Sequence, residues 1–139
     1  MTGHIDPERA QFEAFKALPR DTPINMLNLV RVREKAAYPD GRDATGHQAY
    51  AAYGRDSRPV FDKVGGSILW RGSFETVLIG PSTEHWDYAF VARYPNAGAF
   101  LAMVTDPVYQ EAVKHRQAAV LDSRLIRMGE ISGGSGFAG

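Results

Sequence analysis

Apolar residues recur at helical spacing in four segments of the chain, and each of these segments is predicted to be an α-helix. Two of them begin with an Asp-Pro pair, Asp6-Pro7 and Asp106-Pro107, in which the carboxylate caps the first turn and proline takes the first helical position. The second segment contains Pro59, where we expect a kink or a restart, and it ends at Gly65-Gly66. The expected helices cover residues 6–18, 46–64, 97–104 and 107–121.

Four other segments have the alternating pattern of β-strands: residues 23–32, 67–80, 85–94 and 123–131, with a bend or bulge expected near Gly72. Both faces of these strands are largely apolar. After the leading helix the order of elements is β-α-β-β-α-β, which predicts an α+β, ferredoxin-like subunit with its helices on one face of an antiparallel sheet. The uncovered apolar face needs a partner, and a second copy is the simplest one, so we expect a homodimer whose sheets pack face to face.

Composition excludes several classes of function. The 139 residues suffice for one domain with a sizeable core. The 16 basic and 16 acidic residues give no net charge, and no basic block is present, so we expect no nucleic-acid partner. The chain has no cysteine, which excludes thiolate catalysis and cysteine-ligated metals. No apolar run is long enough to span a bilayer, and the first residues lack the pattern of a signal peptide, so we expect a cytoplasmic protein.

Arg116 is the most informative candidate for a binding residue, because it lies in the middle of the apolar stripe of helix 107–121, with Tyr109 on the same stripe and His115 at its edge. A buried guanidinium is costly unless it is paired. It could pair with a buried carboxylate, for which Asp87 is the best candidate and Asp122 a second, or it could cap carbonyl groups. The functional alternative is that its fork of donors holds the anionic or carbonyl end of a small ligand.

Other polar and aromatic residues also have two interpretations. Tyr50 and Tyr53 lie on the buried stripe of helix 46–64, either as core or as the wall of a pocket. Asn28, in the middle of a strand, either binds local backbone or faces a cavity. We expect Trp86 to pack in the core or the dimer interface. Four scattered histidines form no pattern that binds a metal, so no metal site is expected.

Residues 24–128 resemble the domain-of-unknown-function family 1330 of the dimeric α/β-barrel superfamily. The resemblance rests on "NMLNLVR" (25–31), "AYAAYGRDSRPVFDKVGGSILWRG" (49–72) and "WDYAFVARYPNAGAFLAMVTDPVYQEAVKHRQAAVLDSRL" (86–125). It implies a ferredoxin-like subunit that dimerises through its sheet. It also implies a ligand site between sheet and helices, which in this sequence would be lined by Asn28, Tyr50, Tyr53, Trp86 or Asp87, Tyr109, His115 and Arg116.

Three hypotheses follow. The first is a cofactor-free enzyme, similar to monooxygenases or isomerases of this superfamily, that acts on an aromatic or carbonyl compound. In it Arg116 orients an oxygen, and His115 or Asp87 transfers a proton. The second is a module that binds a metabolite without chemistry, and the third is a dimer without a ligand. The expected organisation is a helical extension (1–22), the ferredoxin-like domain (23–131) and a flexible glycine-rich tail (132–139).

Overall fold

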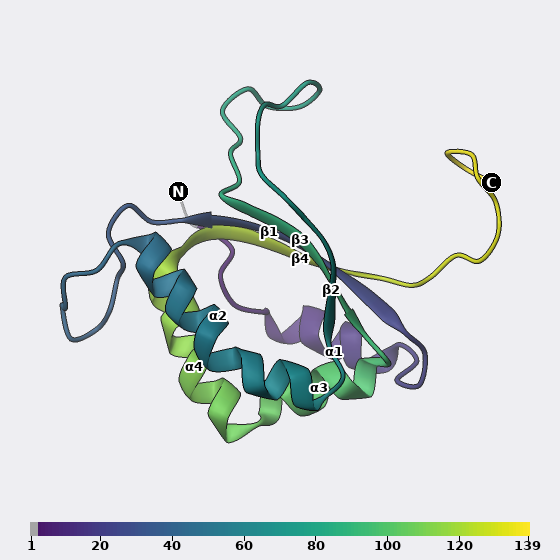
Figure 1. Cartoon of the computed structure of the whole chain (residues 1–139), viewed down its shortest axis with the longest axis horizontal. Helices are drawn as coiled ribbons and strands as arrows, with labels where there is room; N and C mark the ends of the chain where they lie inside the picture. The colour runs from purple at the N-terminus through teal and green to yellow at the C-terminus, as the bar shows by residue number, and fades with distance from the viewer. Residues whose placement is uncertain (1–2) are drawn as a thin grey trace.

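The computed structural model describes residues 3–139, which form four helices and four strands (Figure 1). The helices cover one face of a single curved sheet and leave the other face free. Within residues 3–139, no helix is both long and apolar enough to cross a membrane. In chain order the elements are α1 (Arg9–Ala17), β1 (Ile24–Val32), α2 (Gly46–Lys63), β2 (Ser67–Gly72), β3 (Tyr88–Tyr94), α3 (Ala97–Thr105), α4 (Pro107–Ala119) and β4 (Val120–Met128).

The sheet has the strand order β2-β3-β1-β4, and every neighbouring pair is antiparallel. With α2 between β1 and β2, and α3 and α4 between β3 and β4, this is the ferredoxin-like arrangement that the sequence predicts. In β1 the alternate residues Ile24, Met26 and Val30 are buried against the helices, whereas Leu27 and Leu29 lie on the opposite face and stay partly exposed. We call that opposite side of the sheet the open face.

The helix starts show how short polar motifs set the boundaries. Thr45 and Gln48 form a capping box at α2: the Thr45 side chain accepts from the Gln48 amide at 3.0 Å, and the Gln48 side chain accepts from the Thr45 amide at 2.9 Å. At α4 the predicted cap is confirmed, because Asp106 Oδ1 accepts from the Val108 amide at 2.8 Å. α2 continues through Pro59 as one helix, so the expected restart there is wrong.

Several predicted boundaries are wrong. The first helix begins at Arg9 with Glu8 at its N-cap, because Asp6 instead accepts a hydrogen bond from Gln117 at 3.2 Å. The strand expected over residues 67–80 ends at Gly72, and the next strand begins at Tyr88 rather than at residue 85. Last, α4 gives way to β4 at Val120, earlier than expected.

Residues 73–87, the β2–β3 arm, connect the two strands outside the sheet and rise on the side away from the helices (Figure 1). The alternating sequence after Gly72 therefore does not continue the sheet. Only the β1 side of β3 continues past Tyr88: the Asp87 amide donates to Val30 O, and its carboxylate accepts from the Val32 amide, both at 2.8 Å. On the other side, the pairing of β2 with β3 ends at Gly72 and Ala89.

Candidate functional site

Arg116 joins three parts of the chain. From α4, its guanidinium donates to the carbonyl oxygen of Ile5 and, at 3.1 Å, to the Ser123 hydroxyl of β4. Ser123 is 5% exposed and donates in turn to His4 O at 2.7 Å. The predicted ion pair of Arg116 with Asp87 or Asp122 is therefore wrong. Of the interpretations of this arginine, the one in which it caps carbonyl groups describes its contacts.

Tyr50, Tyr53 and Tyr109 come together between α2, α4 and the sheet. The hydroxyls of Tyr53 and Tyr109 lie 2.9 Å apart, and the ring of Tyr50 stacks on that of Tyr88 with centroids 4.7 Å apart. Burial raises the pKa of all three hydroxyls above that of a free tyrosine, so they are neutral donors at physiological pH. Tyr53 and Tyr109 pair their hydroxyls with each other, and Tyr50 contributes ring contacts to Tyr53 and Tyr88.

Asn28 lies on the helix-facing side of β1, level with Phe90 of β3 and Leu125 of β4. Its side-chain amide donates to Met26 O at 3.0 Å, so it binds local backbone. Both Asn28 and Arg116 remain partly exposed, as do Tyr50 and Tyr53. The sheet-and-helix interface thus brings together five of the predicted ligand-binding residues: Asn28, Tyr50, Tyr53, Tyr109 and Arg116.

Asp87 and Trp86 lie elsewhere, in the last part of the β2–β3 arm, where it meets the end of β1. Asp87 Oδ1 lies 2.9 Å from His85 Nε2 and 4.0 Å from His47 Nε2. Burial alone would raise the pKa of Asp87, but the hydrogen bonds from the Val32 amide and His85 outweigh it and hold the pKa below its usual value. Asp87 is therefore a carboxylate that these hydrogen bonds hold in position. Trp86 is 7% exposed, its indole donates to Glu84, and Arg124 lies over its ring.

His115 takes part in a hydrogen-bond chain at the surface of the helical layer. Its Nδ1 lies 2.6 Å from the Tyr38 hydroxyl, and its Nε2 lies 3.3 Å from Asp56 Oδ2 on α2. The side chain of His115 is 22% exposed. A hydrogen bond from Arg55, and to a lesser degree the contact with His115, lowers the pKa of Asp56, which therefore acts only as an acceptor. In the tautomer that donates from Nε2 to Asp56, Nδ1 is free to accept a hydrogen bond from the Tyr38 hydroxyl.

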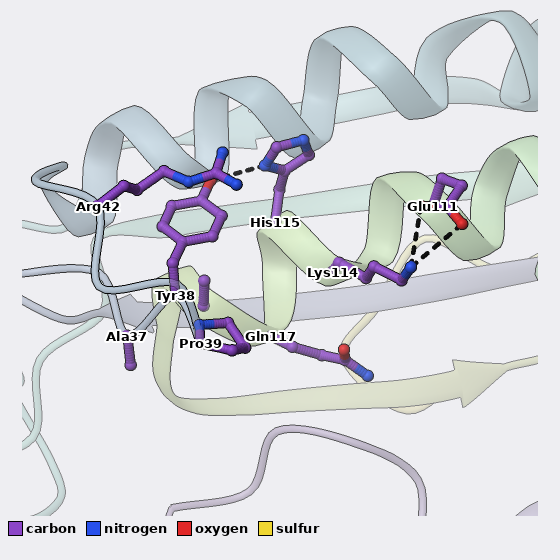
Figure 2. Close-up of a pocket in the computed structure, with 9 residues that line it drawn as sticks. Ala37, Tyr38, Pro39, Arg42, Glu111, Lys114, His115 and Gln117 are labelled. Atoms are coloured by element: carbon purple, nitrogen blue, oxygen red, sulfur yellow. Dashed lines mark hydrogen bonds and ion pairs between the residues drawn. The ribbon is translucent and has the colours of Figure 1, made fainter.

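The Tyr38–His115 pair opens into a cavity of about 320 Å³ between α4 and the connector that follows β1 (Figure 2). Figure 2 shows Arg42 beside the Tyr38 ring. The guanidinium carbon of Arg42 lies 4.2 Å from the ring centroid. Asp40 holds this guanidinium at 2.6 Å, and Lys114 pairs with Glu111 at 3.0 Å. The remaining lining residues are Ala37, Pro39, Gln117 and Ala118.

His115 also borders a more open hollow of about 610 Å³ on its other side, where Asp56 and Pro59 of α2 face Val108 and Ala112 of α4. The chain of Asp56, His115 and Tyr38 thus connects the two hollows. Among residues 3–139, no cluster of three His, Asp or Glu side chains is arranged to hold a metal ion. Proton transfer and the binding of a polar ligand are the chemistry that these side chains can supply.

The predicted site residues thus fall into three groups: the interior set, the Asp87 group and His115. Tyr38, Asp56 and Arg42 were not predicted from the sequence. Tyr38 is 77 residues from His115 along the chain, so no local spacing connects them. The sequence offered one indication of such a contact. His115 lies at the edge of the apolar stripe of its helix, a position from which a side chain can contact a neighbouring element.

Comparisons with known proteins agree with this fold. The crystal structure of methylated RPA0582 protein is 61% identical, with a TM-score of 0.94 over 97% of this chain and 100% of that chain. A second crystal structure of the RPA0582 protein, described as a protein of unknown function from Rhodopseudomonas palustris, is 60% identical, with a TM-score of 0.91 over 95% of this chain and 100% of that one.

A more distant structure shows the fold alone. It is an uncharacterised NIPSNAP-like domain protein from Burkholderia xenovorans, 15% identical, with a TM-score of 0.52 over 84% of this chain and 91% of that chain. No curated protein matches the sequence. The family model described as Domain of unknown function (DUF1330) matches residues 42–128, a narrower range than the resemblance over residues 24–128. The chain belongs to the DUF1330 family.

Proposed function

We propose that this protein is a cofactor-free enzyme that binds a small carbonyl-containing acid in the His115 cavity and transfers a proton on it. The observation that carries the proposal is the hydrogen-bond chain from Asp56 through His115 to Tyr38, which ends at the cavity. In this proposal Tyr38 donates or accepts the proton of the substrate, His115 relays it, and Asp56 orients the imidazole.

Chemistry at neutral pH supports these roles. A neutral imidazole that donates to a carboxylate at Nε2 is a base at Nδ1, where the Tyr38 hydroxyl lies. The guanidinium of Arg42 over the ring stabilises negative charge that develops on the phenol oxygen. The same hydrogen-bond chain can therefore take a proton from one atom of a substrate and return it to another, which is the requirement for an isomerase.

The charge and size of the cavity define the substrate class. Arg42 and Lys114 place two cations at its rim, and Lys114 can exchange its exposed partner Glu111 for a ligand carboxylate at little cost. A volume of about 320 Å³ lies at the lower end of the range for small-molecule sites. These features favour a compact aromatic or aliphatic oxo acid.

Phenylpyruvate is a suitable probe, because its enol and keto forms interconvert by transfer of one proton and absorb differently. We expect the wild-type protein to accelerate this interconversion, and Tyr38→Phe and His115→Gln each to lower kcat/KM by about 10²-fold or more. Tyr88→Phe is the matched control, because Tyr88 forms a similar pair with His47, at 2.8 Å, outside the cavity. It should retain the wild-type rate.

The alternatives give different results in the same samples. Phenylpyruvate binding by calorimetry without any acceleration would support a module that binds without chemistry. If neither binding nor acceleration is observed across a set of oxo acids, the proposed function is wrong. Equal losses in Tyr38→Phe and Tyr88→Phe would also contradict it, because only one of these hydroxyls lies at the cavity.

We also propose that the working form is a homodimer that pairs through the open face. Leu27, Val91 and Ile126 lie side by side on this face across the three strands β1, β3 and β4. Ile126 is 42% exposed, and Trp70 of the edge strand β2, level with Val91, is 55% exposed. A contiguous apolar surface of this kind is typical of a protein interface.

A further inference from the structure

The β2–β3 arm has an ordered base and an apolar tip without contacts of its own. At the base, the ring of Phe74 packs edge-on against His85 with centroids 4.9 Å apart, and His85 bonds to Asp87. At the tip, Leu78 is 91% exposed and Ile79 is 93% exposed. Two adjacent aliphatic side chains this exposed bury little apolar area in the single chain. Packing them against a partner molecule would remove that area from water, which is favourable.

The direction of the arm indicates where that partner lies. The arm leaves the sheet on the side away from all four helices, which is the side of the open face (Figure 1). A molecule that packs on the open face therefore lies beside the arm. An excursion of this length without a helix or strand is typical of a functional segment.

The accessible area of the chain supports a large interface. One chain exposes 9293 Å². A compact monomer of 15.3 kDa is expected to expose only about 7,100 Å². The excess, about 2,200 Å², includes the exposed carboxyl-terminal tail and is comparable with the area that each subunit of an obligate dimer buries. Outside the carboxyl-terminal tail, the apolar side chains with the highest exposed fractions are Leu78 and Ile79 on the arm and Leu69 and Trp70 on β2.

We propose that the β2–β3 arm clasps a second copy of this chain, with the tip at residues 77–79 packed against the partner molecule beside the paired sheets. This inference rests on the proposed homodimer and adds to it a specific clasp. Two-fold symmetry makes the contact reciprocal, because each subunit contributes one arm and receives one. The clasp extends the interface beyond the sheet and fixes how the two sheets are oriented.

The test is the dimer dissociation constant, measured by sedimentation equilibrium on the wild type and on the double variant Leu78→Asp/Ile79→Asp. Both side chains are more than nine-tenths exposed in the single chain, so the variant should keep the fold, which circular dichroism checks. We expect the dissociation constant to rise at least tenfold. Ile131→Asp is the matched control, since Ile131 is 94% exposed on the tail, and it should leave the constant unchanged.

Single-cysteine cross-linking gives a second measurement, because the chain has no cysteine of its own. Ile79→Cys labelled with a maleimide-benzophenone should form a covalent dimer on illumination. The clasp would be overturned if the wild type is a dimer, the double variant has the same dissociation constant, and Ile79→Cys gives no cross-link. The homodimer would still be supported in that case. A wild-type chain that stays monomeric at concentrations on the order of 100 µM would overturn both the clasp and the homodimer. Binding of the tip to lipid vesicles or to another protein, without any effect on the dimer, would also overturn the clasp.

Discussion

Arg116 lies on the apolar stripe of α4, yet among residues 3–139 it pairs with no acidic side chain. Its charge is stabilised by the Ile5 carbonyl and the Ser123 hydroxyl instead. The Ser123 hydroxyl also donates to the carbonyl of His4. Arg116 and Ser123 together therefore hold the segment before α1 against α4 and β4. The stripe position of Arg116 thus reflects an anchoring role for the N-terminal segment.

Replacing Arg116 by methionine should therefore destabilise the protein. Hydrogen bonds from a charged group contribute about 1.5–3 kcal/mol each, so we expect the loss of the two bonds to lower the free energy of unfolding by about 3 kcal/mol or more. Amide exchange at residues 4–6 should accelerate more than exchange in α2. Urea unfolding and hydrogen exchange measure both effects.

Arg9→Met, on the exposed surface of α1, is the control and should stay within about 0.5 kcal/mol of wild type. If Arg116→Met proved as stable as wild type, the anchoring role would be refuted. Arg116 would then return to the candidates for binding an anionic ligand, because a partly buried cation would be present without any benefit to stability.

At the scale of elements, two glycines of α2 are in opposite surroundings. A Cβ on Gly46 would lie 1.9 Å from the Arg33 carbonyl oxygen, because the start of α2 packs directly on the end of β1. A Cβ on Gly54, in the middle of the same helix, would meet nothing within 4 Å. Gly46 is thus required by packing, whereas Gly54 only adds flexibility to the unfolded chain.

We predict that Gly46→Ala lowers the free energy of unfolding by about 2–3 kcal/mol, because β1 and α2 must separate to admit the methyl group. Gly54→Ala should raise it by about 0.5–1 kcal/mol, since alanine favours the helix and no contact is lost. Urea denaturation of the two variants in parallel measures both changes. Equal effects would show that helix propensity, and not the contact with Arg33, controls position 46.

The elements also show what sequence patterns can predict. The same Asp-Pro pair occurs twice, and Asp106 caps α4 as expected, whereas Asp6 bonds to Gln117 on a distant helix. Asp106 also has a tertiary partner, because its second oxygen accepts from Lys63 at 2.8 Å, so the local capping rule holds where one carboxylate oxygen stays on the helix start. Similarly, the alternation after Gly72 predicts a strand, but a strand also needs a neighbour to pair with, and the pairing of β2 with β3 ends at Gly72. The fold class was predictable because it depends on element order, which such shifts leave intact.

At the scale of the whole molecule, the candidate site was only partly predictable. Helical periodicity correctly placed Tyr109 and Ala112 in the interior, since it reports which face of one helix is buried. It carries no information about which residues of other segments meet that face. Tyr38, on the connector after β1, and Asp56, on α2, both contact His115. Asp87 pairs with His85 and not with Arg116. Pairing charges by sequence alone fails for this reason.

The open face leads to a prediction about the stability of the assembly. If two chains pair through this face, unfolding requires dissociation, and mass action raises the melting temperature with protein concentration. For two chains of this length, a hundredfold increase in concentration should raise it by about 5 °C. Differential scanning calorimetry or fluorimetry measures this shift.

Ile126→Glu should lower the melting temperature and abolish its dependence on concentration, because a carboxylate cannot be buried unpaired between two sheets. Leu18→Glu is the control: Leu18 is 50% exposed and follows α1 outside the sheet, so the variant should keep the wild-type dependence. A wild-type melting temperature that does not change with concentration would contradict the homodimer. The apolar open face would then be exposed to water in the working protein, and the binding of a different partner there would be its remaining explanation.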